Sequence, residues 1–279
     1  MECGLQPIPD WPSVYFDSSS HTLLMVYVDD FMAAGPPAAL AAMWERLRPR
    51  LRIGDPGPVS VFLGCTQRES SMPHPSLPIT LRVLEYDMED FLLSSLALFQ
   101  QLTCDVVSHT SPTPYLGESL CLDPLSPADV QIPVLPAGRY ATVAARILMK
   151  LLYSARMARP ELLRPIIALA CYMHAWTVVH DKALLRLLSY VKGSLDLRQW
   201  SWIDPTDTGC HLHVFADADF AGCHATQRST SGITVQFGSQ RSHCPASSTP
   251  KDSRASAIAR LRLRLWPSTL LSESAPCLF

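Results

Sequence analysis

The first quarter of the chain alternates between apolar runs and short polar turns. Residues 21–28 are mostly apolar and lead into two adjacent carboxylates, Asp29 and Asp30, and a second apolar run covers residues 31–34. This pattern predicts two strands joined by a tight turn, with the carboxylates at the turn. Residues 11–16 predict a preceding strand, and residues 17–20 (Asp-Ser-Ser-Ser) predict the turn that follows it.

Helical spacing of apolar residues dominates the middle of the chain. It predicts helices over residues 38–47, 86–99, 140–157, 160–176 and 181–192. Acids lie in the first turn of the second helix, Pro160 and Glu161 suit the first turn of the fourth, and Gly193 is a natural cap for the last.

Strand patterns lie on both sides of these helices. Residues 59–66 predict a strand with Gly64 near its end. A glycine at this position is also compatible with an ordinary strand residue or a β-bulge. Residues 71–78 predict a proline-rich loop. Residues 211–215 alternate as a strand, and residues 228–238 predict a turn and a second strand.

Composition sets the broad class of the protein. The chain has 279 residues, of which 48% are hydrophobic, so it can bury one large or two ordinary cores. Six of its prolines fall within residues 111–138 and predict a linker. The nine cysteines form no CxxC pair, which favours reduced thiols in an intracellular chain. No apolar run is long enough to predict a transmembrane helix.

The net charge of −2 is not typical of a nucleic-acid-binding protein, which usually carries a basic face. The adjacent carboxylates are the clearest candidate for chemistry. Asp29 and Asp30 repel each other and are costly to bury unpaired, so they are either exposed at a hairpin tip or neutralised by a cation. Mg²⁺ suits them best, because it is a hard cation that binds one or two carboxylates together with substrate phosphates. An ordinary solvent-exposed Asp-Asp turn is the alternative.

Several motifs occur in an order that carries a family resemblance. Tyr27-Val28-Asp29-Asp30, with Gly35 five residues on, resembles the YVDD box in the palm of reverse transcriptases. The chain as a whole resembles the Pol polyprotein of copia-type LTR retrotransposons over roughly residues 12–240. Further matches are residues 59–66 (a hairpin beside the primer terminus), Arg159-Pro160-Glu161, His180, residues 190–194, and residues 216–222 with 228–232, which resemble the opening of the family's RNase H domain.

The resemblance implies an α+β fold. It would contain a partial reverse transcriptase palm and thumb, a helical connection and a partial RNase H-like α/β sheet. The implied domains are the C-terminal half of the palm with the thumb (residues 1–110), a proline-rich linker (111–139), the helical connection (140–205), the N-terminal part of the RNase H-like domain (206–240) and a divergent, disordered tail (241–279).

The resemblance also implies the site residues and partners. Asp29 and Asp30 would be catalytic ligands of two Mg²⁺ ions, and Asp217 would be the first metal-binding carboxylate of the RNase H-like domain. Tyr27, Val28, Leu63 and Gly64 would contact the primer. The implied partners are an RNA template, a DNA primer and an RNA/DNA hybrid, with no membrane and no defined protein partner. The implied location is cytoplasmic or nuclear, in a virus-like particle in the family.

Both implied active sites are incomplete in the sequence. The family's third palm carboxylate has no matching motif among the 28 residues before Asp29, and after Asp219 the only acids are Asp252 and Glu273. We therefore expect a fragment truncated at both ends that does not polymerise DNA alone. The alternatives are a non-catalytic module that binds nucleic acid or a protein, and an untranslated or unstable relic.

Two further segments have open interpretations. The tail after residue 240 is rich in Arg, Ser and Leu, which indicates a change of reading frame or a basic segment that binds RNA or a membrane surface. Cysteines and histidines gather in residues 210–244, but their spacing matches no zinc motif and is more typical of a polar strand face.

Overall fold

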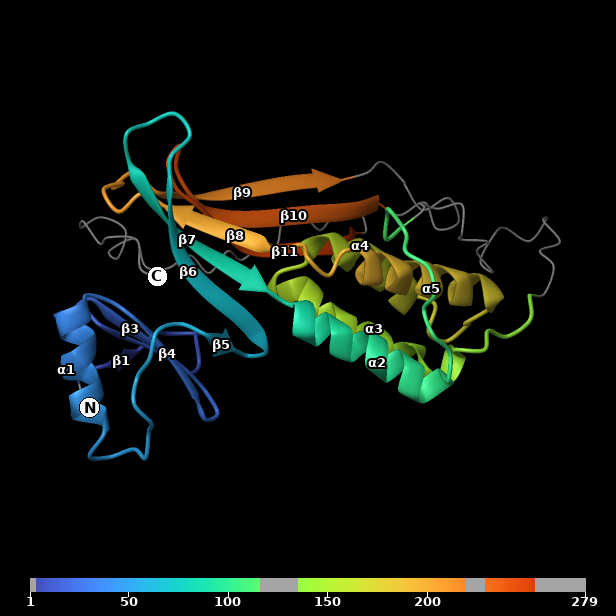
Figure 1. Cartoon of the computed structure of the whole chain (residues 1–279), viewed down its shortest axis with the longest axis horizontal. Coiled ribbons are helices and arrows are strands. Elements are labelled where there is room, and N and C mark those ends of the chain that lie inside the picture. Colours follow the sequence, from blue (N-terminus) through green and yellow to red (C-terminus); the bar gives the residue numbers. More distant parts are fainter. Residues whose placement is uncertain (1–3, 116–134, 219–228, 254–279) are drawn as a thin grey trace.

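The computed structural model describes residues 4–115, 135–218 and 229–253, and the fold below refers to these residues. They form two antiparallel sheets and five α-helices, as the predicted α+β class requires. In Figure 1 the smaller sheet lies at the lower left, the larger sheet lies above it, and most of the helices lie to the right. In the described part of the chain no helix is long and apolar enough to cross a membrane.

The smaller sheet carries the Asp29–Asp30 turn. Its strands β1 (Gln6–Pro7), β2 (Val14–Asp17), β3 (Thr22–Tyr27) and β4 (Asp30–Ala34) lie in chain order and are joined as hairpins. Helix α1 (Pro37–Leu47) packs on one face through the buried residues Leu24, Met43 and Leu47. Leu24 and Val26 of β3 both belong to this core, because residues two apart on a strand face the same side.

The larger sheet joins strands from distant parts of the chain. Its order is β5 (Val61–Phe62), β6 (Cys65–Pro73), β7 (Thr80–Asp87), β8 (Gln199–Ile203), β11 (His243–Ser253), β10 (Ser229–Gly238) and β9 (His211–Ala218). Strand β8 pairs with β7 over Arg82–Tyr86 and with β11 at His243. Segments assigned to the palm and thumb region, to the helical connection and to the RNase H-like region therefore share one sheet.

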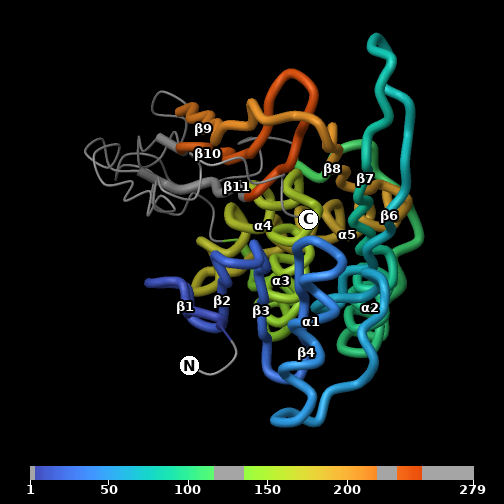
Figure 2. Tube along the Cα trace, turned by 90° about the vertical axis from the view of Figure 1, so that its left-hand side faces the viewer, coloured from blue at the N-terminus to red at the C-terminus, as the bar shows by residue number. Residues whose placement is uncertain are grey.

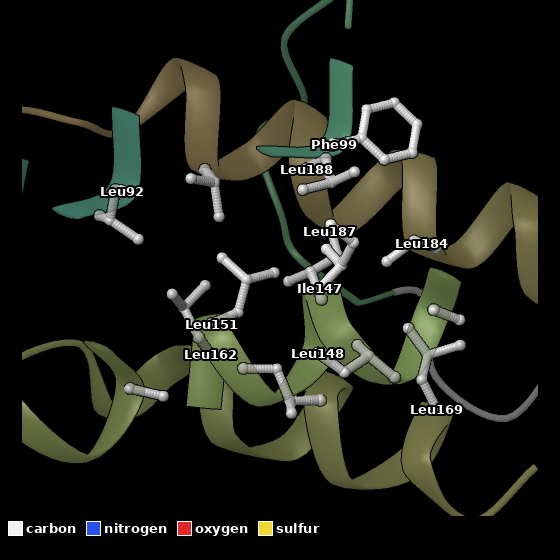
Figure 3. Packing of buried hydrophobic residues seen from close by; sticks show 14 of the residues in the cluster. Leu92, Phe99, Ile147, Leu148, Leu151, Leu162, Leu169, Leu184, Leu187 and Leu188 are labelled. Carbon is white, nitrogen blue, oxygen red and sulfur yellow. The ribbon is translucent and has the colours of Figure 1, made fainter. Parts of the chain in front are cut away.

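The main hydrophobic core lies among the helices. Helices α2 (Glu89–Thr103), α3 (Ala141–Met157), α4 (Leu163–Ala170) and α5 (Val178–Gly193) pack together, and a short 3₁₀ helix, η2 (Pro160–Leu162), precedes α4. Figure 3 shows how leucines from these helices converge. The fully buried members include Leu92, Phe99, Ile147, Leu148, Leu151, Leu162, Leu184, Leu187 and Leu188. Their spacing of three or four residues explains why these segments are helical.

Several predicted boundaries are wrong. Residues 80–87 form strand β7, so the helix predicted over 86–99 begins at Glu89. The single strand that periodicity predicts over 59–66 is a hairpin that turns at Leu63–Gly64, as the family resemblance implies, and β6 continues to Pro73, into the predicted loop. The helix predicted over 160–176 is interrupted by the 3₁₀ turn and ends at Ala170.

The C-terminal predictions also need correction. Helix α5 begins at Val178, before the predicted start, because Thr177 and His180 form a capping box, and it includes Gly193. The tail predicted to be disordered from residue 241 contains strand β11, which pairs with β10. Residues 254–279 of that tail and residues 116–134 of the predicted linker lie outside the described residues.

The helical core predicts a large effect of one substitution. Leu151 is fully buried on α3, so Leu151→Ala should lower the free energy of unfolding by about 2–5 kcal/mol through reduced burial and a cavity. Urea denaturation followed by the helical signal in far-UV circular dichroism would measure it. Met149 on the same helix is 51% exposed, so Met149→Ala is the matched control and should change stability by less than about 0.5 kcal/mol.

Candidate functional site

The two carboxylates lie at the tip of the β3–β4 hairpin. Tyr27 pairs with Asp30 at the ends of the two strands, which leaves Val28 and Asp29 as the two-residue turn. All four side chains are exposed, and the exposed fraction reaches 58% for Tyr27 and 84% for Val28. The carboxylates are therefore presented to solvent, where they can reach an external cation or ligand.

The turn holds a backbone conformation that valine adopts rarely. Val28 has a φ of 55°, in the left-handed region, where a β-branched side chain is strained by about 1–3 kcal/mol. A two-residue hairpin turn requires positive φ at its first residue, and glycine usually supplies it. A strained valine at an exposed tip is typical of a position at which function outweighs stability.

Asp17 anchors the other end of this sheet. Its carboxylate accepts hydrogen bonds from the Ser19 hydroxyl at 2.6 Å and the Ser19 N–H at 3.0 Å, and Arg46 of α1 lies 3.4 Å away. The Ser19 bonds stabilise the charged form and outweigh the effect of burial, so the pKa of Asp17 falls to about 2. This carboxylate fixes the β2–β3 turn on α1.

The Leu63–Gly64 turn faces helices α2 and α3. The Leu63 carbonyl accepts a hydrogen bond of 2.5 Å from the Tyr153 hydroxyl of α3, and a Cβ added to Gly64 would lie 3.5 Å from Phe91 of α2. The Phe91 and Tyr153 rings are 5.0 Å apart. Gly64 has a φ of 74°, which explains why glycine occupies this turn.

Tyr153 also responds electrostatically to Tyr27 of the carboxylate hairpin. The pKa of its hydroxyl is raised by burial and then by the neighbouring phenol of Tyr27. Tyr153 thus contacts the predicted Leu63–Gly64 turn directly, whereas its link to Tyr27 is an electrostatic effect. The sequence reasoning missed Tyr153; its signal would have been an aromatic residue on the polar face of a predicted helix.

Asp217 lies elsewhere. It is an exposed residue of β9, the edge strand of the larger sheet, and its carboxylate accepts the N–H of Ala218 at 2.9 Å. Figures 1 and 2 both show β9 far from the β3–β4 hairpin. Its neighbour Asp219 lies outside the described residues. Within the described ranges, no group of three or more His, Cys, Asp or Glu residues could hold a metal ion.

Two family-like motifs meet at the C-terminal end of α5, and a third, His180, lies at its N-terminal end. Arg159 is 2% exposed and donates to Glu161 at 2.6 Å and to the Ser194 hydroxyl at 2.8 Å. His180 accepts the Thr177 N–H at 2.9 Å, and burial lowers its pKa. Arg159 joins the ends of α3 and α5, and His180 caps the start of α5, so these motifs have structural roles in the helical core.

Comparison with known proteins gives one distant relative. The chain is 26% identical over 254 residues to the uncharacterized mitochondrial protein AtMg00810 of Arabidopsis thaliana, and the match covers 90% of this chain and 94% of that protein. No family model matches the chain, and no solved structure matches it. The similarity therefore extends across both sheets and the helical core.

The strained hairpin tip makes a stability prediction. Val28→Gly should raise the free energy of unfolding by about 1 kcal/mol, because relief of the strained φ outweighs the entropy that glycine loses on folding. Chemical denaturation would measure the change. Val26 lies within β3, so Val26→Gly is the control and should destabilise the chain. An unchanged or lower stability of Val28→Gly would show that the turn carries no strain.

The lowered pKa of Asp17 predicts a pH dependence. Its contribution should be fully present above its unfolded pKa of 3.8 and should disappear as the pH falls through about 2. The decrease should approach 2 kcal/mol in the wild type and be missing from Asp17→Asn. Denaturation midpoints of both proteins between pH 4.5 and pH 2 provide the test. Parallel midpoint curves for the two proteins would contradict the assignment.

Proposed function

We propose that this chain derives from the polymerase region of a copia-type retrotransposon and binds the end of an RNA/DNA primer–template. The observation that carries the proposal is the exposed Asp29–Asp30 tip. The Leu63–Gly64 turn is held against α3 by Tyr153, whose pKa also responds to Tyr27 of the hairpin. In the family that the motifs resemble, these two hairpins lie beside the primer terminus. The distant plant mitochondrial relative is compatible with this origin.

In this proposal the hairpin carries the cation. Asp29 and Asp30 are adjacent, exposed oxygen donors, which suits a single Mg²⁺ that keeps several waters and binds nucleic-acid phosphates. Tyr27 and Val28 present a large apolar surface next to these carboxylates, against which the terminal nucleotide can lie. The cation removes the repulsion that the carboxylates would otherwise exert on phosphates.

The proposal stops short of DNA synthesis by this chain. A two-metal polymerase site needs more carboxylates than the pair at the tip, and the described residues bring no third acid to them. The same holds for hydrolysis of the RNA strand, because Asp217 has no acidic partner within the described residues. Either reaction would need carboxylates from another segment or another chain. We therefore propose nucleic-acid binding as the activity of the chain itself.

Magnesium dependence of hybrid binding tests the proposal. A fluorescent RNA/DNA hybrid with a recessed DNA 3′ end is titrated with the full chain, with Mg²⁺ and with EDTA, and binding is followed by anisotropy. The wild type should bind more tightly with Mg²⁺, because the cation links the carboxylates to phosphate. Asp29→Asn/Asp30→Asn should lose this dependence and should not bind more weakly than the wild type in EDTA.

Asp196→Asn is the matched control, because Asp196 is an exposed acid away from the hairpin. It should keep the wild-type response to Mg²⁺. Failure of the wild type to bind the hybrid under either condition would overturn the proposal. Primer extension in the same mixture asks a separate question, and nucleotide incorporation by the wild type that Asp29→Asn abolishes would show that the site is complete after all.

A further inference from the structure

The exposed face of α3 contains none of the motifs identified in the sequence. One face of this helix is buried in the helical core, and the other presents residues at three- to four-residue spacing. The exposed or half-buried residues include Arg146, Met149, Lys150, Tyr153 and Arg156. They form one continuous line along the helix, because such spacing keeps side chains on one side.

This line carries positive charge only. Residues 141–157 contain Arg146, Lys150 and Arg156 and no acid, although the chain as a whole has a net charge of −2. Among the described residues, no carboxylate forms an ion pair with any of these three cations.

Several other exposed cations are paired with carboxylates. Arg48 pairs with Asp55 at 2.7 Å, Arg68 with Glu85 at 2.8 Å, and Arg82 with Glu69 at 2.6 Å. The α3 cations are thus available for a partner that supplies negative charge.

This row of exposed α3 residues includes Tyr153, which contacts the Leu63–Gly64 turn of the candidate site. Tyr153 lies between Lys150 and Arg156 on α3 and donates its hydroxyl to the Leu63 carbonyl. The Lys150 ammonium lies 4.9 Å from the centre of the Phe91 ring, which itself contacts Tyr153. Arg146 lies ten residues before Arg156, which is about 15 Å along a helix. One strand of a duplex presents about four phosphates over that length.

We infer that the exposed face of α3 is a phosphate-binding surface for the duplex part of an RNA/DNA primer–template whose end lies at the Asp29–Asp30 hairpin. This inference rests on the proposed function and assigns it a second surface. Arg146, Lys150 and Arg156 contact backbone phosphates, while Met149 and Tyr153 cover the sugar edge between them. Such contacts are independent of base sequence and act through release of counterions.

The salt dependence of hybrid binding in EDTA tests the inference, because the hairpin cation is then absent. The full chain is titrated with a blunt RNA/DNA hybrid at several potassium concentrations. Arg146→Gln/Arg156→Gln should bind about tenfold more weakly than the wild type near 0.1 M salt. The slope of log K against log salt should become shallower by about 2, which is about one unit for each arginine that no longer neutralises a phosphate.

The matched control removes two exposed cations elsewhere. Arg52→Gln/Lys182→Gln has the same net charge as the α3 variant, and both residues are exposed. It should keep the wild-type slope. Equal slopes for the α3 variant and the control would overturn the inference, whatever the Mg²⁺ response of the hairpin. Absence of wild-type binding in EDTA together with binding in Mg²⁺ would overturn the inference and leave the proposed function in place.

Unfolding is excluded by a separate measurement. The α3 variant should keep the far-UV spectrum and the urea midpoint of the wild type, because both arginines are exposed. Lys150→Gln provides an independent variant, and it should reduce the slope by about 1. A wild-type slope for Lys150→Gln would remove Lys150 from the surface.

Discussion

The buried carboxylate of Asp181 holds the helical half of this protein in place. It lies in the first turn of α5 and accepts three hydrogen bonds, from the N–H groups of Arg139 at 2.6 Å and Tyr140 at 3.1 Å and from the Trp176 indole at 2.7 Å. The first two donors lie just before α3, so one side chain fixes where α3 begins relative to α5. Loss of this acceptor would leave buried donors unsatisfied, which costs about 1–3 kcal/mol for each group.

The surroundings of Asp181 show how tightly this region is packed. A Cβ at Gly138 would lie 2.7 Å from the Asp181 carboxylate and 2.6 Å from the Thr177 carbonyl, so only glycine fits. The position of α3 in turn places Tyr153 against the Leu63 carbonyl. It also places the cations of α3 on the outer face of the helix. A second group of charges couples this core to the larger sheet, since Arg198 pairs with Glu89 at 2.6 Å and with Asp87 at 3.1 Å. The helices beside the candidate site are therefore held both by the Asp181 hydrogen bonds and by the Arg198 ion pairs.

The sequence predicted those elements whose residues lie close together along the chain. The β3–β4 hairpin and helix α3 follow from local periodicity, because their patterns of apolar residues favour one secondary structure clearly over the others. Strand β7 was missed because Arg82 and Glu85 look solvated until β6 supplies Glu69 and Arg68 opposite them. Strand β11 contains Pro245 and many polar residues, which favour the predicted disorder, yet pairing with β10 overrides that preference. The hydrogen bonds of Asp181 to Arg139 and Tyr140 join residues about 40 positions apart, which no local pattern reveals.

The central claim is that the hairpin tip and the outer face of α3 hold the two parts of one primer–template. Replacement of Mg²⁺ by Fe²⁺ in the presence of ascorbate and peroxide tests it directly, because hydroxyl radicals then cut nucleic acid near the bound ion. The account predicts that cleavage of the bound hybrid is concentrated within a few nucleotides of the DNA 3′ end, and that it disappears in Asp29→Asn/Asp30→Asn. Uniform cleavage along the hybrid, or cleavage that persists in this variant, would contradict it.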